Sequence, residues 1–382
     1  MAGAARGAEG PRPSWSDRLH ALRNRLLASP RFQRLAAAFP PTRPVARRRA
    51  RALFDLCAGF VYAQVLAACV ELRLFEILRA GPQTGTALAL RLGLPQARLC
   101  RLLDAAASLD LLDRRGPDRY ALGTLGAATL GNPGVAAMVA HHGALYRDLA
   151  DPVALIRGGG ETALAAYWPY AGAADPAALP PESVRAYTAL MSASQPLVAA
   201  GLLDAYPFAR HRRLLDIGAG DGTFLEAVAA RAPGLALHGF DLPAVAGLAR
   251  ARFARLGLAG RAAATGGDVF ADPLPGGFDL ATLVRVIHDH DDPEALRILR
   301  AARAALAPGG TLLIAEPLAG APGGGPIGDA YFAFYLLAMG SGRARTAAEL
   351  ERLAREAGFA RAAQRRTDNP ILCGLVVAET SR

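Results

Sequence analysis

Leu214-Leu215-Asp216-Ile217-Gly218-Ala219-Gly220-Asp221-Gly222-Thr223-Phe224 is the stretch of sequence that decides the fold. An apolar run enters a glycine-rich turn, and a helical pattern follows. Glycines at 218 and 220 lack a Cβ, so the turn can adopt positive φ angles and approach a bound ligand closely. A dinucleotide fingerprint places its third glycine three residues after the second, whereas Gly222 follows after two. The spacing favours a ligand without a pyrophosphate, with S-adenosylmethionine as the obvious candidate; a plain strand-to-helix turn is the alternative.

Strands and helices alternate from residue 211 to the end of the chain. Short apolar runs predict strands at 214–217, 236–240, just before 267, 280–287, 311–315 and 371–378. This order is typical of a doubly wound parallel sheet. Ligands of such sheets bind at the carboxyl ends of the strands, so functional residues should directly follow them.

Acidic residues follow the second and third expected strands. Asp241 ends the second strand, at the separation from the glycine turn where a carboxylate accepts the ribose hydroxyls of an adenosine ligand; helix capping is the alternative. Asp268 could contact the adenine amino group while Phe270 covers the ring. No Lys or Arg lies within the glycine turn, which fits the positive charge of a sulfonium. The cofactor-binding residues that we expect are Asp216, Gly218, Gly220, Gly222, Asp241, Leu242, Asp268, Val269, Phe270 and Arg285.

The fourth and fifth strands lead to candidate catalytic residues. We expect His288, at the carboxyl end of a strand, to act as a general base, although a lone sheet histidine is often only a core residue. Glu316 ends the next strand and could hold the imidazole in one tautomer. A hydrolase zinc pattern, His-x-His-x-Asp-His, fails because Pro293 replaces its last histidine. Magnesium is a weaker alternative to helix capping for the remaining acids, so we predict no metal site; these acids are Asp289, Asp291 and Asp292.

Residues 51–131 read as a helix, a helix-turn-helix and a small hairpin, the order of a winged helix. A DNA-binding module should present several basic or amide groups from its second helix. Residues 96–109 offer Gln96, Arg98 and Arg101 but also Asp104, so dimerisation is favoured over DNA binding. The uncharged apolar run 56–70 is shorter than the roughly 20 residues that a membrane-spanning helix needs, so we expect a buried helix there.

The net charge of +10 resides in the N-terminal segment. Residues 1–51 hold twelve arginines and two acidic residues, and the remainder is balanced, which gives no electrostatic reason for nucleic-acid binding. Within this segment Trp15, Leu19, Leu22 and Leu26 share one helical face. Such a basic amphipathic helix suits a membrane interface, and packing on the protein itself or on a partner subunit is equally open. The four cysteines are scattered, as core residues of a protein in a reducing cytoplasm would be.

These motifs together resemble the S-adenosylmethionine-dependent O-methyltransferases of the caffeic acid and acetylserotonin class. The resemblance implies an α/β chain whose C-terminal, Rossmann-like class I methyltransferase domain follows a mainly helical winged-helix dimerisation domain in a homodimer. We expect a basic extension at 1–50, the dimerisation domain at 51–131, a helical linker lining the substrate pocket at 132–210 and the cofactor domain at 211–382. Met191 resembles a substrate-contacting methionine of the family. The expected substrate-binding residues are Met191, His141, His142 and Asp289.

The sequence departs from the family pattern twice. Where the family often has Gly-x-Glu-Arg-Thr, this chain has Ala344 in place of the glutamate, so a second acid beside the base is missing. Where the family has a tryptophan two residues after the base, this chain has His290.

The opening, from Leu22 to Leu78, resembles the hydroxyneurosporene O-methyltransferases of purple phototrophic bacteria. This resemblance implies a lipophilic acceptor with a tertiary 1-hydroxyl, an acyclic carotenoid. It also implies a cytoplasmic enzyme with peripheral contact to the inner membrane through residues 1–50. Three alternatives remain: a phenolic or polyketide acceptor, C-methylation of a tetrapyrrole, and a winged-helix transcription regulator with a ligand-sensing domain.

Overall fold

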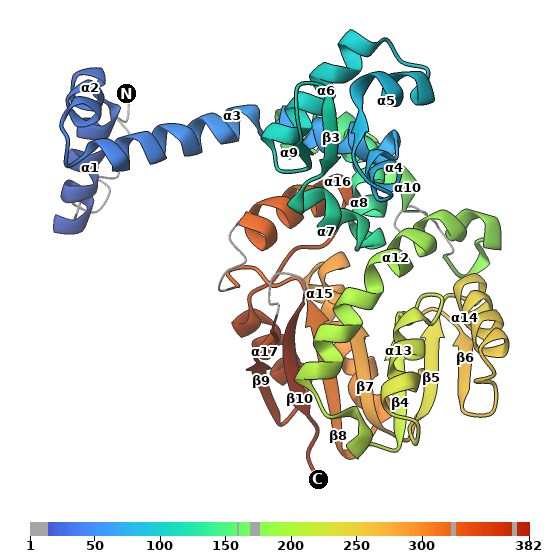
Figure 1. Ribbon diagram of the computed structural model, residues 1–382. Coiled ribbons are helices and arrows are strands. Elements are labelled where there is room, and N and C mark those ends of the chain that lie inside the picture. Colours follow the sequence, from blue (N-terminus) through green and yellow to red (C-terminus); the bar gives the residue numbers. More distant parts are fainter. Residues whose placement is uncertain (1–13, 159, 169–175, 322–325, 369–372) are drawn as a thin grey trace, which may run out of the picture.

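The computed structural model describes residues 14–158, 160–168, 176–321, 326–368 and 373–382. Figure 1 shows a sheet domain, a smaller helical domain on top of it, and an arm that projects from the helical domain. The arm, residues 14–51, consists of α1 (Trp15–Ala28), α2 (Pro30–Ala38) and the start of α3 (Arg43–Glu71).

The sheet domain is built on a seven-stranded sheet in the order β6-β5-β4-β7-β8-β10-β9. β4 lies at its centre, paired in parallel with β5 and β7, so the glycine turn leaves the middle of the carboxyl edge. The strands are β4 (Arg213–Ile217), β5 (Ala236–Asp241), β6 (Ala262–Gly266), β7 (Phe278–Val284), β8 (Leu306–Glu316), β9 (Arg361–Arg365) and β10 (Gly374–Glu379).

The sheet differs from the sequence-based expectation at three points. Within this sheet β10 runs opposite to the other described strands, antiparallel to both β8 and β9, and only a short connection separates it from β9. β9 was not predicted, since its sequence Arg-Ala-Ala-Gln-Arg lacks an apolar run. β7 ends at Val284, earlier than predicted, where Arg285 adopts a φ of 58°. Part of the last predicted strand, 369–372, lies outside the described residues.

Helices cover both faces of this sheet (Figure 1). One face packs against α12, α13 and α14, whose side chains include Leu202, Phe224 and Phe253. The other packs against α15 and α17 through Ile298 and Leu353. The bounds are α12 (Pro181–Ala205), α13 (Thr223–Arg231), α14 (Pro243–Arg255), α15 (Asp292–Ala305) and α17 (Ala347–Glu356).

The smaller domain has the winged-helix order that the sequence predicts. Its three-stranded sheet, in the order β1-β3-β2, lies beside the helix-turn-helix pair α5 and α6. Leu74, Leu88, Leu103 and Tyr120 form its core with Cys69 of α3. The elements are α4 (Leu74–Leu78), β1 (Gln83–Thr84), α5 (Gly85–Leu92), α6 (Gln96–Ser108), β2 (Leu112–Arg114), β3 (Arg119–Leu122) and α7 (Thr124–Leu130).

A third helical group connects the two domains. α8 packs along α12, and the latter continues through Pro196 instead of breaking there. A cluster that includes Leu145, Trp168 and Tyr335 joins this group to α16. The elements are α8 (Pro133–Asp148), α9 (Pro152–Ile156), α10 (Ala163–Tyr167), η1 (Pro176–Ala178), η2 (Phe208–Arg210), η3 (Ile287–Asp289), η4 (Ile327–Tyr331) and α16 (Phe332–Met339).

The prediction that 56–70 forms a buried helix is wrong in part. These residues are helical, but Leu56 is 81% and Phe60 68% exposed, and Cys57 is exposed too. Among the described residues, α3 is the one helix long and apolar enough to span a membrane by length and composition. Only its end, from Val65 onward, packs in the winged-helix core. α3 therefore extends beyond the domain against which its apolar residues were expected to pack.

Candidate active site

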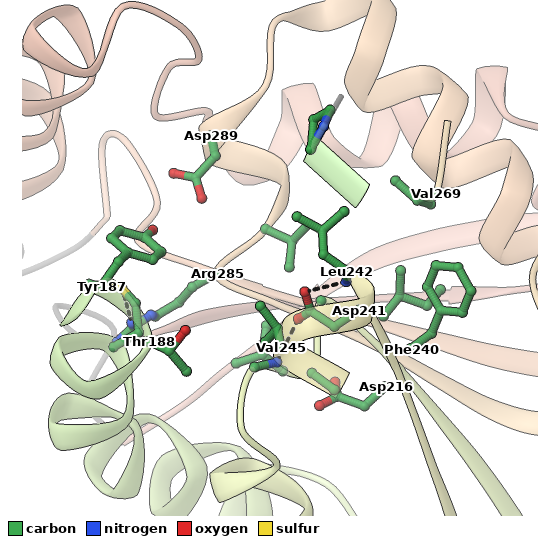
Figure 2. A pocket seen from close by; sticks show the side chains of 18 of the residues that line it. Tyr187, Thr188, Asp216, Phe240, Asp241, Leu242, Val245, Val269, Arg285 and Asp289 are labelled. Carbon is green, nitrogen blue, oxygen red and sulfur yellow. Dashed lines mark hydrogen bonds between the residues drawn. The ribbon is translucent and has the colours of Figure 1, made fainter. Parts of the chain in front are cut away.

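A cavity of about 450 Å³ opens at the carboxyl ends of β4, β5 and β7, where the sequence places the candidate chemistry. Figure 2 shows it with Tyr187 and Asp289 on one side and Phe240 and Val269 on the other. Its lining includes eleven predicted site residues: Met191, Asp216, Gly218, Gly220, Asp241, Leu242, Asp268, Val269, Phe270, Arg285 and Asp289.

The glycine turn needs its glycines for two different reasons. Gly218, Gly220 and Gly222 all have positive φ angles. A Cβ on Gly218 would lie 2.6 Å from the Val286 side chain at the cavity wall. Gly222 lies outside the cavity lining, and its Cβ would meet the Phe253 ring at 2.6 Å. The third glycine therefore lets α13 start close to α14, and the structure gives it no place beside a ligand.

Two carboxyl groups stand at this turn, Asp216, which is buried, and Asp241, which is half-buried. Asp241 accepts hydrogen bonds from the N–H groups of Gly220 and Leu242, both at 2.7 Å, and Figure 2 shows it facing the cavity. Loss of solvent raises the pKa of Asp241 to about 6 against these hydrogen bonds. Asp216 accepts a bond from the Thr282 hydroxyl at 2.6 Å, and burial together with nearby Asp241 raises its pKa to about 7. Two acids in one cavity are suited to a ligand that brings positive charge.

The far end of the cavity has an aromatic wall. The N–H of Phe270 donates to Asp268 at 2.9 Å, which fixes the loop after β6. The ring of His290 meets the Phe270 ring edge-on at 5.4 Å between centroids, and Arg297 lies over that ring at 4.8 Å. His290 thus lines the cavity in the position where the sequence departs from the family tryptophan.

His288 lies beside the cavity and not in its lining; it is only 9% exposed. Its Nδ1 contacts Glu316, and its Nε2 lies 3.2 Å from Asp289 Oδ1. Glu316 also accepts bonds from the N–H groups of Val286 and Ile287, at 3.0 and 2.7 Å. One glutamate therefore holds both the imidazole and the backbone that carries it.

The charges around His288 change its protonation. Burial acts to lower the pKa of His288, but Asp289 and Glu316 outweigh it and raise the pKa above its usual value. Burial raises the pKa of Asp289 to about 6. Two carboxylates therefore flank the imidazole even though Ala344 replaces the glutamate of the family pattern. The second one comes from Asp289, the neighbour of His288 in the chain.

A buried arginine that the sequence analysis missed fixes the loop that carries His288. Arg345 is 2% exposed and donates to the carbonyls of Ile287 and His290, each at 2.8 Å. Its guanidinium also binds Asp292 Oδ1 at 2.9 and 2.7 Å. The one indication in the sequence was an arginine next to Ala344, where the chain departs from the family pattern. Residue spacing does not predict contacts between loops that are so distant in the chain.

α12 forms the remaining wall of the cavity. Arg285 reaches it from the end of β7 and donates to the Ser194 hydroxyl and to Met191 Sδ, each at 2.7 Å. Met191 therefore lies where predicted. The sequence analysis did not assign the other lining residues of this helix, although polar residues on one face of an apolar helix were a signal; they are Tyr187, Thr188, Ser192 and Gln195.

The pair His141-His142 lies outside this cavity. Nε2 of His142 is 2.9 Å from the Tyr331 hydroxyl, and Nε2 of His141 is 3.2 Å from that of Tyr335. Burial lowers the pKa of both imidazoles. His142 joins α8 to η4, and His141 joins α8 to α16, the helix whose Phe332 ring lies 5.8 Å from the His288 ring. The contact of both histidines with substrate stays a prediction.

The described part of the chain holds no cluster of three or more His, Cys, Asp or Glu side chains arranged for a metal ion. Asp291 and Asp292 instead bind the segment after α16: Asp291 accepts from the Gly342 N–H at 3.1 Å, and Asp292 from Arg343 and Arg345.

Comparison with known proteins identifies the family. An O-methyltransferase domain model matches residues 146–360, and an O-methyltransferase dimerisation domain model matches residues 54–132. The chain belongs to the S-adenosylmethionine-dependent O-methyltransferases. Demethylspheroidene O-methyltransferase of Cereibacter sphaeroides is 45% identical over 88% of this chain and 88% of its own length. The enzyme of that name from Rhodobacter capsulatus is 40% identical over 93% and 88%, and acetylserotonin O-methyltransferase of Mus musculus 34% over 84% and 86%.

Solved structures support the same assignment for this O-methyltransferase. Mitomycin 7-O-methyltransferase superposes with a TM-score of 0.70 at 27% identity, over 88% of this chain and all of its own. Human N-acetylserotonin methyltransferase in complex with S-adenosylmethionine shares the fold, with a TM-score of 0.74 at 24% identity, over 87% and 98%. The cavity fits that cofactor: Gly218 and Gly220 of the turn line it, the carboxyl groups of Asp216 and Asp241 lie in it, and the glycine turn itself carries no cationic side chain.

Proposed function

We propose that this O-methyltransferase methylates a hydroxyl of a lipophilic acceptor, the tertiary 1-hydroxyl of an acyclic carotenoid. Two relatives named for demethylspheroidene, at 45% and 40% identity, support this acceptor over that of the acetylserotonin enzyme at 34%. The observation that carries O-methylation is the imidazole of His288 held between Glu316 and Asp289 at the cavity.

His288 serves as the base in this proposal. The contact of Nδ1 with Glu316 keeps the proton on Nδ1, so the lone pair of Nε2 is available to a hydroxyl. Asp289 lies 3.2 Å from Nε2 and lines the cavity, so it can accept a hydrogen bond from the acceptor hydroxyl and orient it. S-adenosylmethionine, when bound, supplies the electrophilic methyl group on a positively charged sulfur.

Proton transfer from an alcohol has to accompany methyl transfer. An alcohol with a pKa near that of water, about 15.7, would cost about 12 kcal/mol to ionise with an unperturbed histidine of pKa about 6.5, and the raised pKa of His288 makes this cost smaller. For a phenol the same comparison gives about 5 kcal/mol. His288 therefore accepts the proton as the carbon–oxygen bond forms, and positioning supplies much of the rate.

We assign the remaining cavity residues to parts of the cofactor or of the acceptor according to their chemistry. We assign Asp241 to the ribose hydroxyls, because both of its oxygens are already oriented by backbone N–H groups. Asp216 is assigned to the cationic part of the cofactor, and Asp268 with Phe270 to the adenine. Met191 and the aromatic residues of the α12 side, Tyr187 and Trp168, give the acceptor an apolar surface.

The enzyme works as a homodimer, which the dimerisation domain supports. Acyclic carotenoids dissolve in lipid, so we place the enzyme in the cytoplasm, peripheral to the inner membrane.

Incubation with methyl-labelled S-adenosylmethionine tests the acceptor. Three acceptors are compared: an acyclic carotenoid with a tertiary 1-hydroxyl, a phenol and a tetrapyrrole. We expect label as a methyl ether on the carotenoid, identified by mass spectrometry. Label on a tetrapyrrole carbon, or transfer to the phenol alone, would show that the proposed acceptor is wrong.

A further inference from the structure

Helix α1 has the geometry of a helix that lies in a lipid interface. An α-helix turns about 100° per residue, so Trp15, Leu19, Leu22 and Leu26 fall within an arc of about 60°. Arginines flank this apolar arc, with Arg18 and Arg25 on one side and Arg23 on the other. The most polar residues lie opposite the arc: Asp17, His20 and Asn24.

The helix carries its own N-terminal cap. Ser14 and Asp17 make a capping box, in which the Ser14 hydroxyl accepts from the Asp17 N–H at 3.2 Å and Asp17 accepts from the Ser14 N–H at 2.8 Å. The apolar arc nevertheless faces solvent, with Trp15 76% and Leu22 55% exposed. Figure 1 shows α1 and α2 clear of both domains, so the described part of this chain leaves the arc uncovered.

The neighbouring elements add exposed apolar and basic residues. Leu35 on α2 and Phe39 directly after it are exposed, and α2 packs against α3, which carries the basic run Arg47–Arg49. Residues 14–51 together hold ten arginines and one acidic residue. The match to the dimerisation model begins at residue 54, beyond this arm.

Charge distinguishes between the candidate partners of the arm. A second copy would bring another ten arginines to the contact, and the rest of the chain is neutral overall, so self-association of this face is opposed. An anionic bilayer surface attracts the arginines and accepts the tryptophan and leucines at the boundary of head groups and acyl chains. Long arginine side chains beside an apolar arc can reach the phosphates while their stems lie in the apolar layer.

We propose that the arm, residues 14–51, binds an anionic membrane surface through the Trp15–Leu26 face of α1. The binding partner of this face of α1 is the lipid surface. This inference deepens the peripheral location given above, and it does not depend on the identity of the acceptor. It gives the enzyme a way to meet an acceptor that stays in the bilayer.

Vesicle binding by the full-length protein tests the proposal. The variant Leu19→Glu/Leu22→Glu changes the apolar face, and His20→Glu/Asn24→Glu adds the same charge to the opposite face of the same helix. We expect binding to phosphatidylglycerol-containing vesicles but little to phosphatidylcholine alone, with a loss of about tenfold or more in the first variant and about threefold or less in the control. Vesicles should also shift the fluorescence of Trp15 to the blue, a shift that Trp15→Phe removes.

Three results would overturn the proposal: no binding of the wild type to anionic vesicles, equal losses in both double variants, or a lower molar mass of the first variant with unchanged vesicle binding. The last result would assign the face to a subunit contact. Methyl transfer to an acceptor presented in detergent should be equal in all variants, which separates this test from that of the proposed function.

Discussion

At the residue scale, the sequence predicted most of the side chains at the cavity but not the contacts that hold them in place. Asp241, Asp268 and Asp289 were placed by the rule that chemistry follows parallel strands, and all three line the cavity. His288 was identified by the same rule. The contact of Asp289 with Nε2 was not predictable, because the sequence does not show which backbone turn follows a strand. Here β7 has ended and a 3₁₀ turn places them together.

Glu316→Gln tests how the imidazole is held. A glutamine amide facing Nδ1 would favour the wrong tautomer, so we expect kcat to fall by about 100-fold or more with unchanged cofactor affinity. Because Glu316 raises the pKa of His288, and the neutral imidazole is the base, the rate should rise with pH through that pKa. In the variant the inflection should move to lower pH. Asp279→Asn is the control, since Asp279 also accepts two backbone N–H bonds but at the opposite end of the sheet. An unchanged rate and pH profile would contradict the proposed role.

Cofactor affinity should depend on pH through the two acids at the glycine turn, Asp216 and Asp241. The pKa of Asp216 is raised to about 7 and that of Asp241 to about 6, so both lose their charge as the pH falls below these values. A cationic ligand favours the ionised carboxylates, and affinity should therefore decrease by about tenfold or more from pH 8 to pH 5. Calorimetric titration with S-adenosylmethionine measures this directly; a constant affinity over that range would be inconsistent with the assignment of Asp216.

At the element scale, the loop after β7 is fixed by a segment that follows it much later in the sequence. Arg345 binds two carbonyls of this loop and Asp292 at the start of α15, and the Ser341 hydroxyl donates to the Asp289 carbonyl at 3.0 Å. Sequence periodicity predicted the helices and most strands but contains no information on such loop-to-loop contacts. The orientation of β10 escaped prediction for the same reason, since strand direction is set by the connection and by pairing.

Arg345→Met should loosen this loop. Two buried carbonyls would lose their donor, so we expect a loss of about 2 to 4 kcal/mol in unfolding free energy, measured by denaturant titration. At temperatures where the variant stays folded, kcat should fall while the affinity for S-adenosylmethionine stays unchanged. The control is Arg343→Met, which removes the half-exposed ion pairs to Asp292 and Glu349 and should cost about 1 kcal/mol or less. Equal effects of the two substitutions would show that Arg345 has no special role.

At the scale of the whole molecule, α3 carries the largest difference from the sequence-based expectation. The sequence predicts a buried helix over 56–70, but the part of α3 before Val65 extends beyond the domain. One sequence does not show whether an apolar face is covered within the chain or by another subunit. The exposed apolar residues at 53–61 cover an arc of about 160°, compared with about 60° on α1, which indicates enclosure by protein; they are Leu53, Phe54, Leu56, Phe60 and Val61.

Phe60→Arg tests whether residues 53–61 of α3 lie in the dimer interface. A charge buried in an apolar contact is costly, so the variant should dissociate to monomers at concentrations where the wild type is dimeric. Light scattering after size-exclusion chromatography gives the molar mass. Asp55→Arg, on the opposite side of the same helix, should remain dimeric. A dimeric Phe60→Arg would place the interface elsewhere in the dimerisation domain.

The most direct measurement of the central claim is single-turnover methyl transfer by His288→Ala, with cofactor affinity measured on the same preparation. We predict that transfer from S-adenosylmethionine to the hydroxyl acceptor becomes slower by about 100-fold or more, while the dissociation constant of the cofactor stays within about threefold of the wild type. Transfer at the wild-type rate would contradict the assignment of His288 as the base.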